Sequence, residues 1–104
     1  MNINFIVNNM GFLRYFMPLV IEANKRNISS KLFMVKSTKY CNCHKYLNDL
    51  KSLSEQYNFG LHEAEKINKF PSQVTFVVEG RSAKKIKYDT LKISLVCLFD
   101  FLFF

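Results

Sequence analysis

The chain has no tryptophan, three glycines, two prolines and three cysteines among its 104 residues. An odd number of cysteines without spaced pairs excludes a disulfide framework. Gly-x-Gly-x-x-Gly is also missing, so we expect no nicotinamide or flavin cofactor. No low-complexity linker, internal repeat or change of composition divides the chain, so residues 1–104 are expected to form one domain.

A secretory leader is lacking as well. The first residues carry no basic leader, and their apolar run is broken by Asn8, Asn9 and Arg14. The apolar end, residues 93–104, is too short to cross a bilayer as a helix, and Asp100 interrupts it. These features predict a cytoplasmic protein with free thiols, and they leave open a peripheral contact with the inner face of the membrane.

The formal net charge is +7 and the sequence pI is about 9.5. Such a charge suits an anionic partner such as nucleic acid, an acidic bilayer face or a phosphate ligand. The lysines are scattered, however, and arginine is rare while Asn, Lys, Ile and Phe abound, as AT-rich codon usage produces. We therefore favour a solvated, lysine-rich surface, and nucleic-acid binding remains the alternative function.

Apolar spacing separates segments typical of strands from segments typical of helices. Strands are predicted at residues 2–7, 30–35, 59–62, 74–78 and 91–98. Helices are predicted at residues 12–26, 44–57 and, as a short polar helix, 63–69; residues 81–90 are left as a loop or a short helix. The alternation predicts an α/β fold, Rossmann-like with three layers and a mostly parallel sheet of four to five strands, incomplete at its C-terminal end.

The first predicted helix has apolar residues at helical spacing, whereas its charged residues lie on or near the other side. Pro18 removes a backbone donor inside this helix, so a kink is expected there. Asn27 follows the last basic residues and suits a left-handed cap.

The start of the chain has a recognisable pattern of a strand, a tight turn and a helix. The turn is Asn8-Asn9-Met10-Gly11, and the helix carries Arg14 and Pro18 and ends in Lys25-Arg26-Asn27. It resembles the start of GT-B-type nucleotide-sugar glycosyltransferases and of related bacterial enzymes that synthesise surface polysaccharides or teichoic-acid-like polymers. The resemblance covers about the first hundred residues of a chain three to four times longer on usual domain sizes. It implies the acceptor-side half of a transferase, whose partners in the full enzyme are a nucleotide-sugar and a glycan acceptor.

The chain departs from that family at one telling position. Many relatives carry a histidine just after the glycine, where it serves as a base toward the acceptor, and this chain has Phe12. The catalytic role is therefore not transferred to any residue here. The family holds its donor mainly in a second domain, which this chain does not include, so we expect the chain to be inactive alone.

The turn at the carboxyl end of the first strand carries the first substrate-binding candidates, Asn8, Asn9 and Gly11. A glycine there allows close approach of a ligand, and its amide can face an anion, although every strand-to-helix connection needs such a turn. Arg14, in the first turn of the helix, opposes the helix dipole, and this small cost points to binding of phosphate or carboxylate. Its alternative is an exposed arginine packed on Tyr15 or Pro18.

Glu79, Gly80 and Arg81 end the strand at residues 74–78 and complete the substrate-binding candidates. A carboxylate there can bind a hydroxyl or act as a base, and an arginine can bind phosphate. A plain strand end with both side chains in solvent explains the same residues, and we favour it.

Two further clusters carry weaker signals. Cys41-Asn42-Cys43-His44 places three possible zinc ligands within four residues, but no second pair completes a site, so no metal is predicted. His62 is expected to be solvated. Lys84, Lys85 and Lys87 beside Tyr88 form a small basic patch with one aromatic ring, and a solvated segment explains it better than nucleic-acid binding.

The leading hypothesis is thus the N-terminal, acceptor-side domain of a glycosyltransferase-like enzyme of cell-surface glycan synthesis. Its acceptor loops would be residues 8–14, 36–44 and 79–81, gathered at one edge of the sheet. The alternatives are a small basic nucleic-acid-binding module and a truncated product that associates through Phe101–Phe104.

Overall fold

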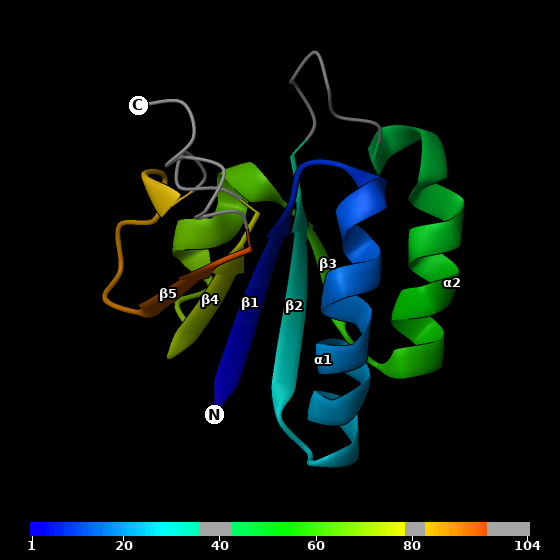
Figure 1. Ribbon diagram of the computed structural model, residues 1–104, viewed down its shortest axis with the longest axis horizontal. Helices are drawn as coiled ribbons and strands as arrows, with labels where there is room; N and C mark the ends of the chain where they lie inside the picture. Colours follow the sequence, from blue (N-terminus) through cyan, green and yellow to red (C-terminus); the bar gives the residue numbers. More distant parts are fainter. Residues whose placement is uncertain (36–42, 79–82, 96–104) are drawn as a thin grey trace.

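The computed structural model describes residues 1–35, 43–78 and 83–95 and shows an α/β fold around one sheet (Figure 1). The strands are β1 (Asn2–Val7), β2 (Ser29–Met34), β3 (Gly60–Glu63), β4 (Val74–Val77) and β5 (Leu91–Ser94). The helices are α1 (Leu13–Lys25) and α2 (Leu47–Tyr57), with 3₁₀ helices η1 (Met10–Phe12), η2 (Cys43–Tyr46) and η3 (Ala64–Lys69).

The five strands lie in the order β3-β2-β1-β4-β5, and every neighbouring pair is parallel. β1 is the central strand: Phe5 is paired with Leu32 on β2 and with Phe76 on β4. The predicted three-layer, Rossmann-like arrangement is confirmed, and the sheet is wholly rather than mostly parallel. All five strands therefore end at the same edge of the sheet.

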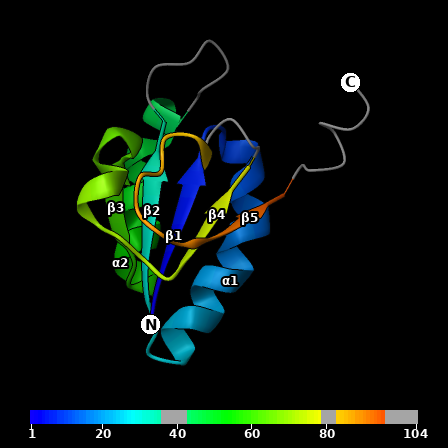
Figure 2. The same cartoon turned by 90° about the vertical axis from the view of Figure 1, so that its left-hand side faces the viewer.

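One face of the sheet is covered by α1 and α2, which lie side by side (Figures 1 and 2). Phe16 of α1 is fully buried against the rings of Phe5 and Phe76, whose centroids lie 5.3 and 6.3 Å away. The rings of Phe5 and Phe76 stack on each other at 5.0 Å. This aromatic cluster joins the first helix to the two strands at the centre of the sheet.

The opposite face is covered by η3 and residues 83–90, which a buried polar network holds in place. The Asn4 amide donates to the Phe70 carbonyl at 2.7 Å and to the Tyr88 hydroxyl at 2.9 Å. The hydroxyls of Tyr88 and Thr90 lie 3.0 and 3.1 Å from that of Thr75. Because Asn4 and Thr75 are paired across β1 and β4, the network ties the polar segment to the middle of the sheet.

Several element boundaries differ from their predictions. The first helix begins with the 3₁₀ turn η1 because the Asn9 side chain, two residues after the strand, already caps the chain there. The α-helix then continues through Pro18. The predicted short helix at residues 63–69 is a 3₁₀ helix from Ala64, and the minor strand is the edge strand β3. Of the last predicted strand, residues 91–94 form β5, and residues 96–98 lie outside the described ranges.

β5 is an edge strand whose apolar side chains are open to solvent. Its register with β4 places Leu91 and Ile93 beside Val74 and Phe76, on the face that α1 covers further along the sheet. Leu91 is 62% exposed, and Ile93 and Leu95 are also exposed. None of the helices described in residues 1–35, 43–78 and 83–95 has the length and apolar character needed to cross a bilayer.

Candidate functional site

The candidate site lies where the direction of strand addition reverses. From β1 the chain adds β2 and β3 on one side of the sheet, and it then returns to add β4 and β5 on the other. The two crossovers on either side of such a reversal leave opposite faces of the sheet, and open parallel sheets usually bind ligands beyond the carboxyl ends of these two strands. Here those strands are β1 and β4, and the turn at Asn8–Gly11 leaves β1 at that edge.

Hydrogen bonds within the turn account for two of its predicted site residues. The Asn9 side chain accepts from the Gly11 amide at 2.8 Å, and the Phe12 amide donates to the Asn9 carbonyl at 3.0 Å. A Cβ atom at position 11 would lie 3.2 Å from Asn9 Oδ1, so glycine is favoured by this close approach. The Gly11 amide that the sequence offered to an anion is therefore occupied by Asn9.

Asn8 differs from its neighbour. Its Oδ1 atom is buried and has no hydrogen-bond partner within the part of the chain that the structure describes. A buried amide oxygen without a donor is costly, and folded proteins seldom tolerate one without a reason. Its position directly after β1, at the strand reversal, makes Asn8 the strongest of the predicted ligand-binding residues.

Arg14 lies on the first turn of α1, where it is paired with Tyr15. Its Nη2 donates to the Tyr15 hydroxyl at 2.8 Å, and its Cζ lies 4.9 Å from the centre of the Tyr15 ring. This contact matches the packed-arginine alternative. The guanidinium retains further donors, however, and remains exposed at the same helix start as the turn.

Tyr15 is the residue at this edge that the sequence analysis missed as a candidate. It is 48% exposed, and its ring centroid lies 6.4 Å from that of Phe12. The available signal was its spacing, because Tyr15 falls off the buried stripe of Leu13, Phe16 and Val20. An aromatic residue on the solvent side of the helix beside an arginine offers a flat surface to a ligand.

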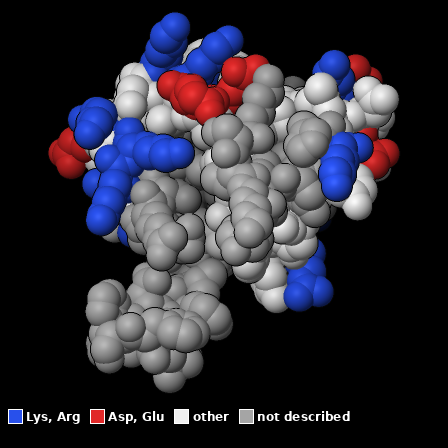
Figure 3. All heavy atoms as spheres, turned by 90° about the horizontal axis from the view of Figure 1, so that it is seen from above, with Lys and Arg blue, Asp and Glu red and all other residues white. Residues whose placement is uncertain are grey.

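The other predicted site residues cannot be placed. Glu79, Gly80 and Arg81 lie outside the described residues, as do positions 36–42 of the second loop. The strand that leads into residues 36–42, β2, ends beside β1, since the Val35 amide donates to the Val7 carbonyl at 3.0 Å. Figure 3 is seen from the side of the strands' carboxyl ends. It shows Lys and Arg side chains at the left and at the right of the view, interspersed with Asp and Glu.

The two weaker clusters gain little support. Within the described ranges, no three His, Cys, Asp or Glu side chains are grouped to hold a metal ion, and Cys41 and Asn42 lie outside those ranges. Lys84, Lys85 and Lys87 are exposed. Tyr88 is half-buried, and its hydroxyl is engaged with Asn4 and Thr75 in the internal network.

His62 is half-buried rather than fully solvated as predicted, because its place on β3 turns the side chain toward Phe70 at the end of η3. Its ring stacks on Phe33 and on Phe70, with centroids at 5.4 and 4.4 Å, and those two rings lie 6.1 Å from each other. Burial, followed by the nearby charges of Lys31 and Lys66, lowers the pKa of His62 below its ordinary value of 6.5. The neutral imidazole is thus part of the fold.

Stability is expected to fall as the pH is lowered below 6.5. The unfolded chain takes up a proton at the ordinary histidine pKa, whereas folded His62 takes it up only at a lower pH. As the pH falls from 6.5 to the lowered pKa, the unfolded state is therefore stabilised relative to the folded state. The His62→Phe variant, which keeps a ring in the stack, should lose part of this dependence. Urea unfolding of both proteins between pH 8 and pH 5 checks it, and identical pH profiles would contradict it.

Comparison of the chain with protein-family models, with curated proteins and with solved structures found no match. The strand order and the residues at the β1–β4 edge are therefore the features that point to a function.

Proposed function

We propose that this chain is the acceptor-side, Rossmann-like domain of a nucleotide-sugar-dependent glycosyltransferase-like enzyme of cell-surface glycan synthesis. The observation that carries the proposal is the strand reversal between β1 and β4, with a polar turn and an arginine at its open edge. This is where open parallel sheets bind their ligands. The family pattern of the first 27 residues supplies the reaction type.

Each residue has a distinct part in this proposal. Asn9 and Gly11 shape the turn, since each satisfies the other. Asn8 offers its buried amide oxygen, which has no partner among the described residues, to an acceptor hydroxyl. Arg14, steadied by Tyr15, binds phosphate or carboxylate on the acceptor. The donor nucleotide-sugar is held by another domain, so the chain alone binds acceptor and transfers nothing.

The proposal is tested by titrating the ¹⁵N-labelled chain with glycerol 3-phosphate, which carries both hydroxyls and an anion. We expect the amide signals of residues 8–14 to shift, and Arg14→Gln to weaken the binding about tenfold. Arg26→Gln is the matched control, because Arg26 lies just past the other end of α1, paired with Glu22 at 3.0 Å. Equal weakening by both variants, or no shift at residues 8–14, would reject the proposal.

A further inference from the structure

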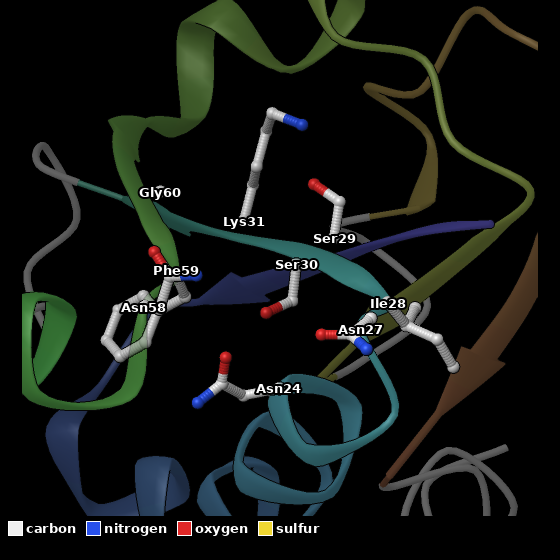
Figure 4. Close-up of a pocket in the computed structure, with 9 residues that line it drawn as sticks. All are labelled: Asn24, Asn27, Ile28, Ser29, Ser30, Lys31, Asn58, Phe59 and Gly60. Carbon is white, nitrogen blue, oxygen red and sulfur yellow. The ribbon is translucent and has the colours of Figure 1, made fainter.

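A pocket of about 540 Å³ opens at the opposite edge of the sheet, where β2 and β3 begin and α1 and α2 end (Figure 4). Five of its lining residues carry amide or hydroxyl side chains: Asn24, Asn27, Ser29, Ser30 and Asn58. The proposed acceptor edge lies at the other ends of the strands, so the two sites share no residue.

Ser30 is the residue that marks this pocket as more than a surface hollow. It is 4% exposed on β2, and its hydroxyl has no hydrogen-bond partner within the described part of the chain. Figure 4 shows Ser30 and Lys31 on opposite sides of β2, with the Ser30 hydroxyl facing Asn24 and Asn27. Alanine would fit at this position without leaving a buried polar group unpaired. The hydroxyl therefore does not contribute to the stability of the fold.

The charges around the pocket disfavour an anionic ligand. Lys31 is the charged residue in the lining, and its ammonium lies 5.9 Å from the centre of the Phe70 ring, on the other face of the sheet. Two helices direct their carboxyl ends here, each continued by an asparagine in the left-handed conformation: Asn27 with φ 57° and Asn58 with φ 54°. Helix carboxyl ends carry partial negative charge, which disfavours anions and favours hydroxyl donors.

The volume and the lining residues of the pocket restrict the class of ligand further. A volume of about 540 Å³ is in the range of small-molecule sites and far exceeds a bare ion. The one aromatic residue of the lining, Phe59, is 5% exposed, so it offers no open face on which a nucleobase could stack. Amides and hydroxyls without charge or stacking surface suit a ligand that both donates and accepts many hydrogen bonds.

We propose that this pocket binds a neutral, sugar-sized polyol, with the Ser30 hydroxyl at its floor and the side chains of Asn24, Asn27 and Asn58 around the ligand. The exposed side chains of Asn27 and Asn58 move aside to admit the ligand to Ser30. The proposal does not depend on the transferase function, because it rests on other residues at the other edge of the sheet.

The test is a titration of the ¹⁵N-labelled chain with D-glucose and with myo-inositol, followed by amide shifts. We expect shifts confined to residues 24–31 and 58–60, with millimolar affinity. D-Glucose 6-phosphate should bind more weakly at these residues, because the helix ends repel its charge. Shifts spread over the whole surface, tighter binding of glucose 6-phosphate here, or a preference for adenosine would each overturn the proposal.

Two substitutions separate binding from folding. Ser30→Ala should weaken glucose binding about tenfold while leaving the melting temperature unchanged or higher. Asn58→Gly keeps the left-handed backbone, and it should weaken binding without loss of stability. Ser52→Ala, an exposed serine of α2 outside the pocket, is the control and should bind as the parent does. Unchanged binding in both pocket variants, or a clear drop in melting temperature for Ser30→Ala, overturns the proposal.

Discussion

Replacing Phe16 with alanine is expected to lower the free energy of unfolding by about 3–5 kcal/mol. The side chain is fully buried, and its ring packs between α1 and the central strands through Phe5 and Phe76. Truncation removes the transfer energy of the ring and leaves a cavity at the junction of three elements. Because small domains are stable by only about 5–15 kcal/mol, much of the margin would be lost.

Urea unfolding followed by circular dichroism measures this effect. Tyr15→Ala is the matched control, because it deletes a neighbouring aromatic ring that is 48% exposed. That variant should lose less than about 1 kcal/mol. Similar losses in the two variants would show that the aromatic cluster does not join the helix to the sheet as described.

Replacing Asn4 with aspartate is the second change with a large expected effect, about 3–5 kcal/mol of destabilisation at neutral pH. Asn4 is 1% exposed, and its amide donates to the Phe70 carbonyl and the Tyr88 hydroxyl. A carboxylate cannot donate, so the Phe70 carbonyl would face a buried negative charge. The Tyr88 hydroxyl can reverse and donate, which offsets only part of the cost.

The aspartate variant should also respond to acid differently from the parent. Burial raises the pKa of its carboxyl when folded, so the unfolded state ionises first as the pH rises and stability is lost in that direction. The difference from the parent should therefore shrink between pH 7 and pH 4 in urea unfolding. Asn48→Asp, an exposed change in the first turn of α2, should stay within about 0.5 kcal/mol of the parent at pH 7.

The local signals of the sequence predicted the fold class and most elements because those signals are strong here. The apolar run at residues 32–35, on β2 and just after it, marks a segment buried on both faces, and the apolar stripe of α1 marks the buried side of that helix. Asn27 was correctly expected as a left-handed cap, because few other residue types accept that backbone. Element boundaries differed from the predictions where a side chain caps the backbone, as the Asn9 side chain does at the start of η1.

The candidate sites were harder to predict, because they depend on which strands become neighbours. The pairing of β1 with β4 joins Ile3 to Val74, and no short-range pattern encodes it. His62 was misjudged for the same reason, since its stacking partners Phe33 and Phe70 lie on separate elements. Ser30 appeared as an ordinary strand residue, and only the packed structure shows its hydroxyl without a partner among residues 1–35, 43–78 and 83–95.

The central place of β1 also has a consequence for synthesis on the ribosome. The first strand to emerge can pair with β2 early, but its other flank stays open until residues 74–77 have been translated. The first backbone amide of β1, that of Asn2, also has its hydrogen bond only after Gln73 has been made, because it donates to the Gln73 side-chain oxygen at 2.7 Å. Through most of translation the nascent chain therefore displays a strand edge with unpaired backbone N–H and C=O groups, which makes it a natural client for a chaperone until β4 has been made.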